Sequence, residues 1–213
     1  MRLYLVRHGQ TAWNAAERAQ GHSDIPLDET GEKQAEALHS AFASRSVGLV
    51  LCSDLGRARQ TAAPIVRATG AEYEETPLLR ERGFGDWEGE SFHDISKWWS
   101  SLEALQGNDR FKLRPPNGES FHDVWERIAP VVERLRSADK NVAVVSHGGT
   151  CGLLLAQLVH GTLETCRAFR FHNTSVTSLE RQTYGPFRIR RYNDISHLDT
   201  DVVLAGSVDG AGR

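Results

Sequence analysis

The sequence lacks the long apolar runs that attachment to a membrane requires. No stretch of its 213 residues approaches the ~20 consecutive apolar residues of a spanning helix. A secretory leader has a charged segment followed by an apolar one. The first apolar stretch of this sequence begins at Leu3, and we see no such leader before it. We therefore expect no membrane partner and a cytoplasmic location.

An excess of positive charge is also absent. The chain carries 25 lysine and arginine residues against 28 aspartate and glutamate residues, and its formal net charge is -3. A protein that binds nucleic acid usually presents a broad basic surface. The sequence therefore predicts no nucleic-acid partner, and clusters of positive charge have to be sought locally.

Cysteines are few, and metal-ligand motifs are absent from the sequence. Cys52, Cys151 and Cys166 share no Cys-x-x-Cys spacing and are odd in number, so we expect buried free thiols. No His-Glu-x-x-His pattern and no cluster of histidine with cysteine indicates a metal site. We expect neither a metal nor another cofactor.

Short apolar runs of strand length recur along the chain. Buried strands are predicted over 3–6, 47–52 and 142–145, and a more exposed strand over 71–79. Alternating residues predict further strands at three positions near the C-terminus, 168–171, 175–181 and 187–192. The residues from Trp13 to Pro26 are expected to form a loop.

Helical patterns lie between these runs, which indicates an α/β protein. Helices are expected after a cap at Asp28, over 55–68 and over 150–159. Two more are expected to begin at the Ser-x-x-Asp pairs of 91–94 and 120–123. Pro64 falls inside the second helix and is expected either to kink it or to begin a new first turn.

One domain accounts for the whole chain, because a sequence of this length can bury a full core. We expect a single domain over 1–213, in which the segment 90–118 forms a helical cap over the site. That segment carries Trp98 and Trp99, which we interpret, like Trp125, as packing residues in preference to substrate contacts. Residues 205–213 are expected to form a flexible tail.

Charged side chains follow four of the predicted strands. Arg7 and His8 follow the first, Arg57 the second, Glu81 the third and His147 the fourth. Ligands of α/β proteins bind at the carboxyl ends of the strands, so we expect these side chains to meet. Arginines stabilise the charge of a phosphoryl group in transfer, and a neutral histidine is a nucleophile for phosphorus. The pattern predicts a phosphate-handling site.

Five ordered blocks of the sequence resemble branch 1 of the histidine phosphatase superfamily, the phosphoglycerate-mutase-like proteins. The resemblance extends over residues 5–177 and lies in Arg7-His8-Gly9-Gln10-Thr11-x-x-Asn14, Ser53-x-Leu55-x-Arg57-Ala58-x-Gln60-Thr61, Glu81 with Gly85-x-Trp87-Glu88-Gly89, Gly118-Glu119-Ser120 and Ser146-His147-Gly148-Gly149. It implies a three-layer α/β/α sandwich with a mostly parallel central sheet. It also implies chemistry without a metal, and a homodimer is common among such proteins.

The resemblance assigns roles to individual residues. His8 would be the phosphorylated nucleophile, and Glu81 would be the proton shuttle. The phosphate would be bound by side chains of Arg7, Arg57, His147 and Asn14 and by the backbone of Gly148. Candidates for contacts with the rest of the substrate are Gln20, Gly21 and Arg82, although loop residues such as Arg82 are equally compatible with a solvated surface.

The resemblance is compatible with two reactions: a phosphatase lets water hydrolyse the phosphoenzyme, whereas a mutase returns the phosphate to the bound substrate. The cap segment is shorter than expected of phosphoglycerate mutases and the C-terminal tail is not basic, which favours a phosphatase for small phosphorylated metabolites. Broad-specificity and α-ribazole-phosphate phosphatases are the most similar types. The alternatives are a cofactor-dependent phosphoglycerate mutase and a fructose-2,6-bisphosphatase-like enzyme.

Two further alternatives are less favoured. A protein phosphohistidine phosphatase would need access for a bulky substrate, which the expected cap restricts. A non-catalytic module that binds phosphorylated ligands would be indicated by loss of His8, Glu81 or His147, and all three are present.

Overall fold

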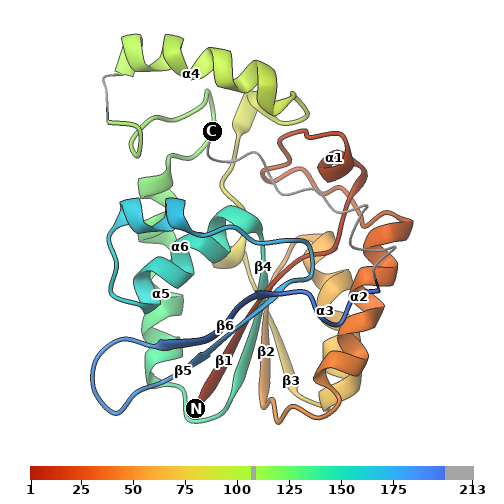
Figure 1. The fold of residues 1–213 in the computed structure, drawn as a ribbon. Coiled ribbons are helices and arrows are strands. Elements are labelled where there is room, and N and C mark those ends of the chain that lie inside the picture. The colour runs from red at the N-terminus through yellow and green to blue at the C-terminus, as the bar shows by residue number, and fades with distance from the viewer. Residues whose placement is uncertain (107–108, 200–213) are drawn as a thin grey trace.

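The computed structural model describes residues 1–106 and 109–199. Its six-stranded sheet has the order β3-β2-β4-β1-β5-β6 (Figure 1). The strands are β1 (Arg2–Arg7), β2 (Leu49–Ser53), β3 (Glu72–Thr76), β4 (Val142–Ser146), β5 (Val176–Glu180) and β6 (Arg188–Asp194). The first four of these strands run parallel, whereas β5 runs antiparallel to both β1 and β6. The predicted mostly parallel sheet is confirmed.

Helices cover both faces of this sheet. The α-helices are α1 (Ala12–Ala15), α2 (Glu29–Phe42), α3 (Gly56–Thr69), α4 (Phe92–Gln106), α5 (Phe121–Ser137) and α6 (Gly148–Leu158). Of the three 3-10 helices, η1 (Pro77–Leu79) and η2 (Gly85–Trp87) lie between α3 and α4, and η3 (Leu163–Ala168) follows α6. In Figure 1, α2 and α3 lie on one side of the sheet and α5 and α6 on the other. The α/β/α sandwich expected from the resemblance is confirmed.

The side-chain alternation of the strands builds two separate cores. Leu3 and Leu5 of β1 pack on the side of α5 and α6, whereas Tyr4 and Val6 pack on the side of α2 and α3. Successive residues of a strand point to opposite faces, so a sheet covered on both faces needs an almost continuous apolar run. This requirement explains the uninterrupted apolar run at 3–6, from which the sequence predicts a buried strand.

Helix caps also follow the sequence. The Asp28 side chain accepts a hydrogen bond from the Gly31 amide at the start of α2. Ser120 and Asp123 exchange side-chain and backbone hydrogen bonds in a capping box at the start of α5. The Ser91 hydroxyl likewise accepts from the Asp94 amide at 3.1 Å. All three predicted caps are confirmed, because a side-chain oxygen satisfies a first-turn amide that has no partner inside its helix.

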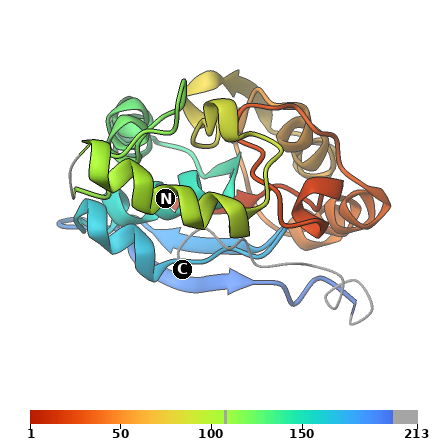
Figure 2. The same ribbon diagram turned by 90° about the horizontal axis from the view of Figure 1, so that it is seen from above.

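Helix α4 lies across the end of the molecule where the parallel strands finish (Figure 2). Trp98 and Trp99 pack against Trp87, with ring centroids 5.4 Å and 5.0 Å away. Trp125 of α5 packs against the core beside α6. The three tryptophans are packing residues, as interpreted from the sequence.

Some local predictions were wrong. Trp13 and Asn14 lie in the short helix α1 and not in a loop, because Thr11 and Asn14 form a capping box. Residues 168–171 form no strand: Ala168 ends η3, and Phe171 reaches the core without pairing in the sheet. Of the two alternatives for Pro64, the new first turn is excluded, since α3 continues through it, and the kink stays a prediction.

Other expectations concern the cysteines, membrane-spanning helices and the C-terminal segment. Cys52, Cys151 and Cys166 are buried free thiols, as predicted. Among the described residues, no helix is long and apolar enough to cross a membrane. The predicted tail at 205–213 lies outside the described residues.

Loss of the α5 cap should destabilise the protein by a measurable amount. Replacing Ser120, which is 1% exposed, in Ser120→Ala removes the acceptor of the Asp123 amide and is expected to cost about 1 kcal/mol of unfolding free energy. Urea denaturation followed by circular dichroism would measure it. The exposed Ser137→Ala at the other end of α5 is the control and should change stability by less than about 0.5 kcal/mol. Equal stability of the two variants would contradict the cap.

Candidate active site

A pocket lies where the four parallel strands end. Seven of the ten residues predicted to form the site line it, namely His8, Asn14, Gln20, Gly21, Arg57, Glu81 and Arg82. The remaining lining residues are Arg18, Phe84, Phe92, Phe121, Gly149 and Leu153. The sequence prediction that these separate segments meet is therefore fulfilled in the fold.

The sheet register brings the two histidines together. In the parallel pairing of β1 with β4, Arg7 lies opposite Ser146, so His8 and His147 are the next residues of adjacent strands. The His8 amide donates to the Ser146 carbonyl at 2.9 Å. The two imidazole rings lie 5.1 Å apart between centroids. Two residues far apart in the sequence thus become neighbours.

His8 is held in one tautomer. Its Nδ1 lies 2.7 Å from the Gly9 carbonyl oxygen, which can only accept, so Nδ1 carries the proton and Nε2 carries the lone pair. Burial, and then the charges of Arg57 and Arg7, hold the pKa of His8 well below its ordinary value. The ring is therefore neutral at neutral pH, and its unprotonated nitrogen is Nε2.

His147 is neutral for the same physical reasons. Burial is the main cause that lowers its pKa, followed by the charge of Arg57. Arg57 Nε donates to His147 Nδ1 at 3.3 Å, and His147 Nε2 lies 2.8 Å from the Ser53 hydroxyl. Because an arginine can only donate, the His147 proton lies on Nε2.

Two buried arginines place positive charge beside the histidines. Arg57 is 0% exposed and donates through Nη1 and Nη2 to the carbonyl oxygens of Ser23 and Gly21, both at 2.8 Å. Arg7 donates through Nη1 to the Phe171 carbonyl at 2.6 Å. Carbonyl groups hold a guanidinium in place without neutralising its charge, so the site favours an anion.

Glu81 enters from the segment after η1 and its carboxylate lies at the start of α6. Oε2 accepts from the Gly149 amide at 2.9 Å, and Oε1 accepts from the Thr150 amide at 3.1 Å and from its hydroxyl at 3.2 Å. A Cβ on Gly149 would lie 2.7 Å from Oε1, so this approach requires glycine. The amides of a helix N-terminus stabilise a carboxylate.

Asn14 and the loop before α2 complete the pocket wall. The Asn14 side-chain oxygen accepts from the Thr11 amide and hydroxyl, both at 3.2 Å, which leaves its NH₂ group as the part that would donate to a phosphate. Gln20 is 7% exposed, and its Oε1 has no hydrogen-bond partner among the described residues. Gly21 adopts φ of 53° where its carbonyl binds Arg57.

Arg82 is buried in an aromatic cage and is not a solvated loop residue. Its guanidinium carbon lies 4.4 Å, 5.2 Å and 4.2 Å from the ring centroids of Phe84, Trp99 and Phe121. The side chain is 6% exposed, and Nη1 has no hydrogen-bond partner among the described residues. Burial lowers the pKa of Arg82 to about 10, so it is charged at neutral pH.

Three predicted phosphate-binding residues are not part of the pocket wall. Arg7 and His147 are buried directly beside His8, and Gly148 is the first residue of α6. The Arg7 charge contributes to the lowered pKa of both histidines, and Gly148 begins the helix whose next amide, that of Gly149, binds Glu81.

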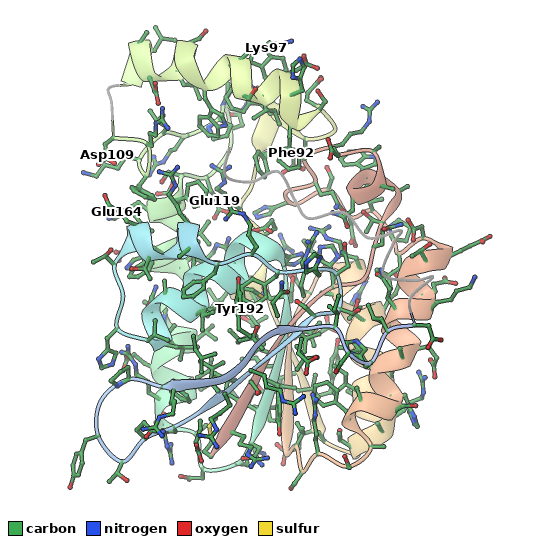
Figure 3. All side chains as sticks on the ribbon, in the orientation of Figure 1. Phe92, Lys97, Asp109, Glu119, Glu164 and Tyr192 are labelled. Carbon is green, nitrogen blue, oxygen red and sulfur yellow. The ribbon has the colours of Figure 1, made fainter. Side chains whose placement is uncertain are left out.

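Sequence reasoning missed the segment that crosses the end of β1. The Asn173 side chain donates to the His8 carbonyl at 2.9 Å, and the Thr174 amide donates to the Arg7 carbonyl at 3.0 Å. It also missed the phenylalanines, of which Phe92 is the first residue of α4 (Figure 3). A polar Asn-Thr pair in front of an apolar strand was the available signal for 173–174.

The described residues contain no group of three or more His, Cys, Asp or Glu side chains that could hold a metal ion. The chemistry that the pocket supports directly is that of a neutral imidazole nucleophile, a carboxyl group and buried cations. Groups of these kinds can catalyse phosphoryl transfer.

Comparisons with known proteins agree with this geometry. The family profile "Histidine phosphatase superfamily (branch 1)" matches residues 3–195. A probable phosphoglycerate mutase GpmB of Photorhabdus laumondii is 34% identical over 211 residues, covering 94% of this chain and 96% of the relative. The adenosylcobalamin/alpha-ribazole phosphatase of Escherichia coli is 36% identical over 192 residues, covering 89% of this chain and 95% of the relative.

A solved structure supports the same assignment. The crystal structure of a putative alpha-ribazole-5'-P phosphatase from Escherichia coli superposes with a TM-score of 0.82 at 32% identity, and the match covers 92% of this chain and 97% of that one. Fold, site geometry and sequence relatives thus agree. The chain belongs to branch 1 of the histidine phosphatase superfamily.

Proposed function

We propose that this protein hydrolyses small phosphorylated metabolites through a phosphohistidine on His8, without a metal. The observation that carries the proposal is the buried, neutral His8 ring, whose Nδ1 is held by Gly9 and whose Nε2 therefore keeps its lone pair. The positive charges of Arg7 and Arg57 beside this ring favour a phosphate at the same place.

The first step transfers the phosphoryl group to the enzyme. Nε2 of His8 forms a bond to phosphorus while the bond to the leaving oxygen breaks, and Glu81, which enters this step in its protonated form, gives its proton to that oxygen. Arg7, Arg57, Asn14 and the Gly148 amide stabilise the charge on the phosphoryl oxygens, and His147 joins them by exchanging its hydrogen bond to Ser53 for one to the phosphate. The dephosphorylated product then leaves as a neutral alcohol.

The second step returns the enzyme to its starting state. Water attacks phosphorus, the bond between nitrogen and phosphorus breaks, and the Glu81 carboxylate takes a proton from the water. The amides at the start of α6 stabilise this carboxylate form. Inorganic phosphate leaves, and the neutral ring of His8 is restored.

The rest of the substrate would contact Gln20, Gly21 and Arg82, with the segment 90–118 as a cap. This assignment rests on the position of the three residues in the pocket wall. Phe92, from α4, stands in the same wall. The names of the relatives, an alpha-ribazole phosphatase and a probable phosphoglycerate mutase, both support a small phosphorylated substrate.

Phosphoglycerate mutase activity is the second candidate, and Arg82 is compatible with it. A buried guanidinium in the pocket wall suits a substrate with an acidic group besides its phosphate. A phosphoglycerate has such a carboxylate, and so do substrates that a phosphatase would hydrolyse. The two activities therefore have to be separated by assay.

Removal of the nucleophile tests the mechanism. We expect His8→Ala to lower hydrolysis by at least about 10³-fold and to abolish an acid-labile phosphoenzyme, because no other group can take the phosphoryl bond. Rapid-quench labelling with ³²P-substrate would measure both. His122→Ala, which changes an exposed histidine of α5, is the control. Undiminished hydrolysis by His8→Ala would remove the proposal.

A second test separates hydrolysis from mutase activity. A panel of phosphomonoesters is expected to release inorganic phosphate faster than 3-phosphoglycerate and 2-phosphoglycerate interconvert, and EDTA should leave the rate unchanged because the mechanism uses no metal. Phosphate release and product identity would be followed together. Dominant interconversion would favour the mutase, and loss of activity with EDTA would contradict a metal-independent reaction.

Arg82 generates a prediction about substrate choice. Arg82→Leu should lower kcat/KM for 3-phosphoglycerate about 10- to 100-fold more than for glycerol phosphate, because only the former carries a carboxylate for the guanidinium to bind. Arg82→Lys keeps the charge and should retain part of this preference. Steady-state kinetics on both substrates would measure it, and equal losses on the two would show that Arg82 only packs.

A further inference from the structure

We propose that Arg127, Glu119 and His22 position Glu81 for proton transfer to the leaving group. None of the three lines the pocket wall. The inference rests on the proposed role of Glu81 as the proton shuttle. It adds to that role a set of residues that hold the backbone of the shuttle and act only through it.

The segment that carries Glu81 has little regular backbone pairing. It leaves the sheet after β3, forms the single turn η1 and then runs to Gly83 without regular secondary structure. Side chains bind its carbonyl groups instead: the Ser146 hydroxyl donates to Leu79 and the Thr150 hydroxyl donates to Arg80, both at 2.8 Å. A catalytic carboxyl on such a segment is only as well placed as these side chains allow.

Arg127 of α5 makes the largest set of these contacts. Its Nη1 lies 2.8 Å from the Leu78 carbonyl and 3.0 Å from the Arg80 carbonyl, and its Nη2 lies 3.1 Å from the Glu81 carbonyl. One rigid, planar guanidinium thus spans the turn that leads to the shuttle. The side chain is 17% exposed, so water has little access to these bonds.

Glu119 fixes the direction of the Arg127 fork. Its two oxygens accept from Nε and Nη2 of Arg127, both at 3.0 Å, in a bidentate pair. Oε2 also accepts from the Gly83 amide at 2.9 Å, two residues beyond the shuttle. Figure 3 shows Glu119 next to the start of α5, on the side of the molecule where α4 lies. Burial raises the pKa of Glu119, but the hydrogen bonds from His22, Arg127 and Gly83 outweigh it and lower that pKa to about 2, so the carboxylate is ionised.

His22 holds the same carbonyl from the opposite loop. Its Nε2 lies 2.9 Å from the Glu81 carbonyl oxygen and 3.5 Å from Glu119 Oε2. The Glu88 carboxylate in turn accepts from the His22 and Ser23 amides, both at 2.8 Å, which fixes the loop. The Glu81 carbonyl therefore receives donors from α5 and from this loop, while its carboxylate receives donors from α6.

This arrangement predicts an effect that depends on the leaving group. A poor leaving group, such as an alkoxide, needs the proton from Glu81 as its bond breaks, whereas p-nitrophenolate leaves without one. Loss of a residue that only stabilises the fold would lower both rates equally. Loss of a positioning residue would lower mainly the rate for the poor leaving group.

The experiment compares kcat/KM, which reports phosphoenzyme formation, for an alkyl phosphate and for p-nitrophenyl phosphate. Glu81→Gln is the reference for a lost proton donor. Arg127→Lys keeps the charge but loses the fork, and His22→Leu removes a donor from a side chain that is 37% exposed. His22→Gln tests rescue, because its amide can still donate. Arg134→Lys is the matched control. Arg134 lies on the same helix as Arg127, α5, and it also makes a bidentate pair with a carboxylate, that of Glu74.

We expect Arg127→Lys and His22→Leu to lower kcat/KM about 10- to 100-fold for the alkyl phosphate and less than about 3-fold for p-nitrophenyl phosphate, as in Glu81→Gln. Arg134→Lys should change neither rate, and His22→Gln should recover most of the alkyl rate. Equal losses on both substrates, or no loss, alongside a selective Glu81→Gln would overturn the inference. If Glu81→Gln itself is not selective, the proposed shuttle role fails instead. Circular dichroism of each variant would confirm folding, and His22→Leu supplies the test if Arg127→Lys does not fold.

Discussion

The parallel pairing of β1 with β4 is the constraint on which the site depends. It places Arg7 opposite Ser146 and thereby makes His8 and His147 the first residues beyond two adjacent strands. A slip of one residue would turn every apolar side chain of β1 to the opposite face, so the two cores fix this register firmly. The separation of the histidine rings is thus a consequence of core packing.

Burial then determines the chemistry of these rings. Two cationic side chains, Arg7 and Arg57, are buried beside two imidazoles, and a second pair of positive charges at this place would be costly. The rings respond by remaining neutral, with their pKa values depressed. The same low-dielectric surroundings that keep the His8 ring neutral would strengthen the attraction of the arginines for an anion such as phosphate.

The Glu81 carboxyl group is positioned by side-chain hydrogen bonds and not by strand pairing. Glu81 lies on a segment whose carbonyls are bound by side chains from β4, α5 and α6, instead of by a neighbouring strand. Such side-chain bonds allow a sharper change of direction than a sheet ladder, and they bring the carboxylate to the first amides of α6. The sheet therefore holds His8, the proposed nucleophile, and a set of long polar side chains holds Glu81, the proposed proton shuttle.

The sequence by itself determined the strands, most helix starts and the polar residues at the strand ends, because apolar alternation and capping are local patterns. It misjudged 168–171, where Phe171 reaches the core without a strand, and it did not reveal Asn173 or the cage around Arg82. Those features join residues far apart in the chain: 164 positions separate Arg7 from Phe171. Only the tertiary structure decided them, since no local pattern records which distant segment will supply a carbonyl, an amide or a ring.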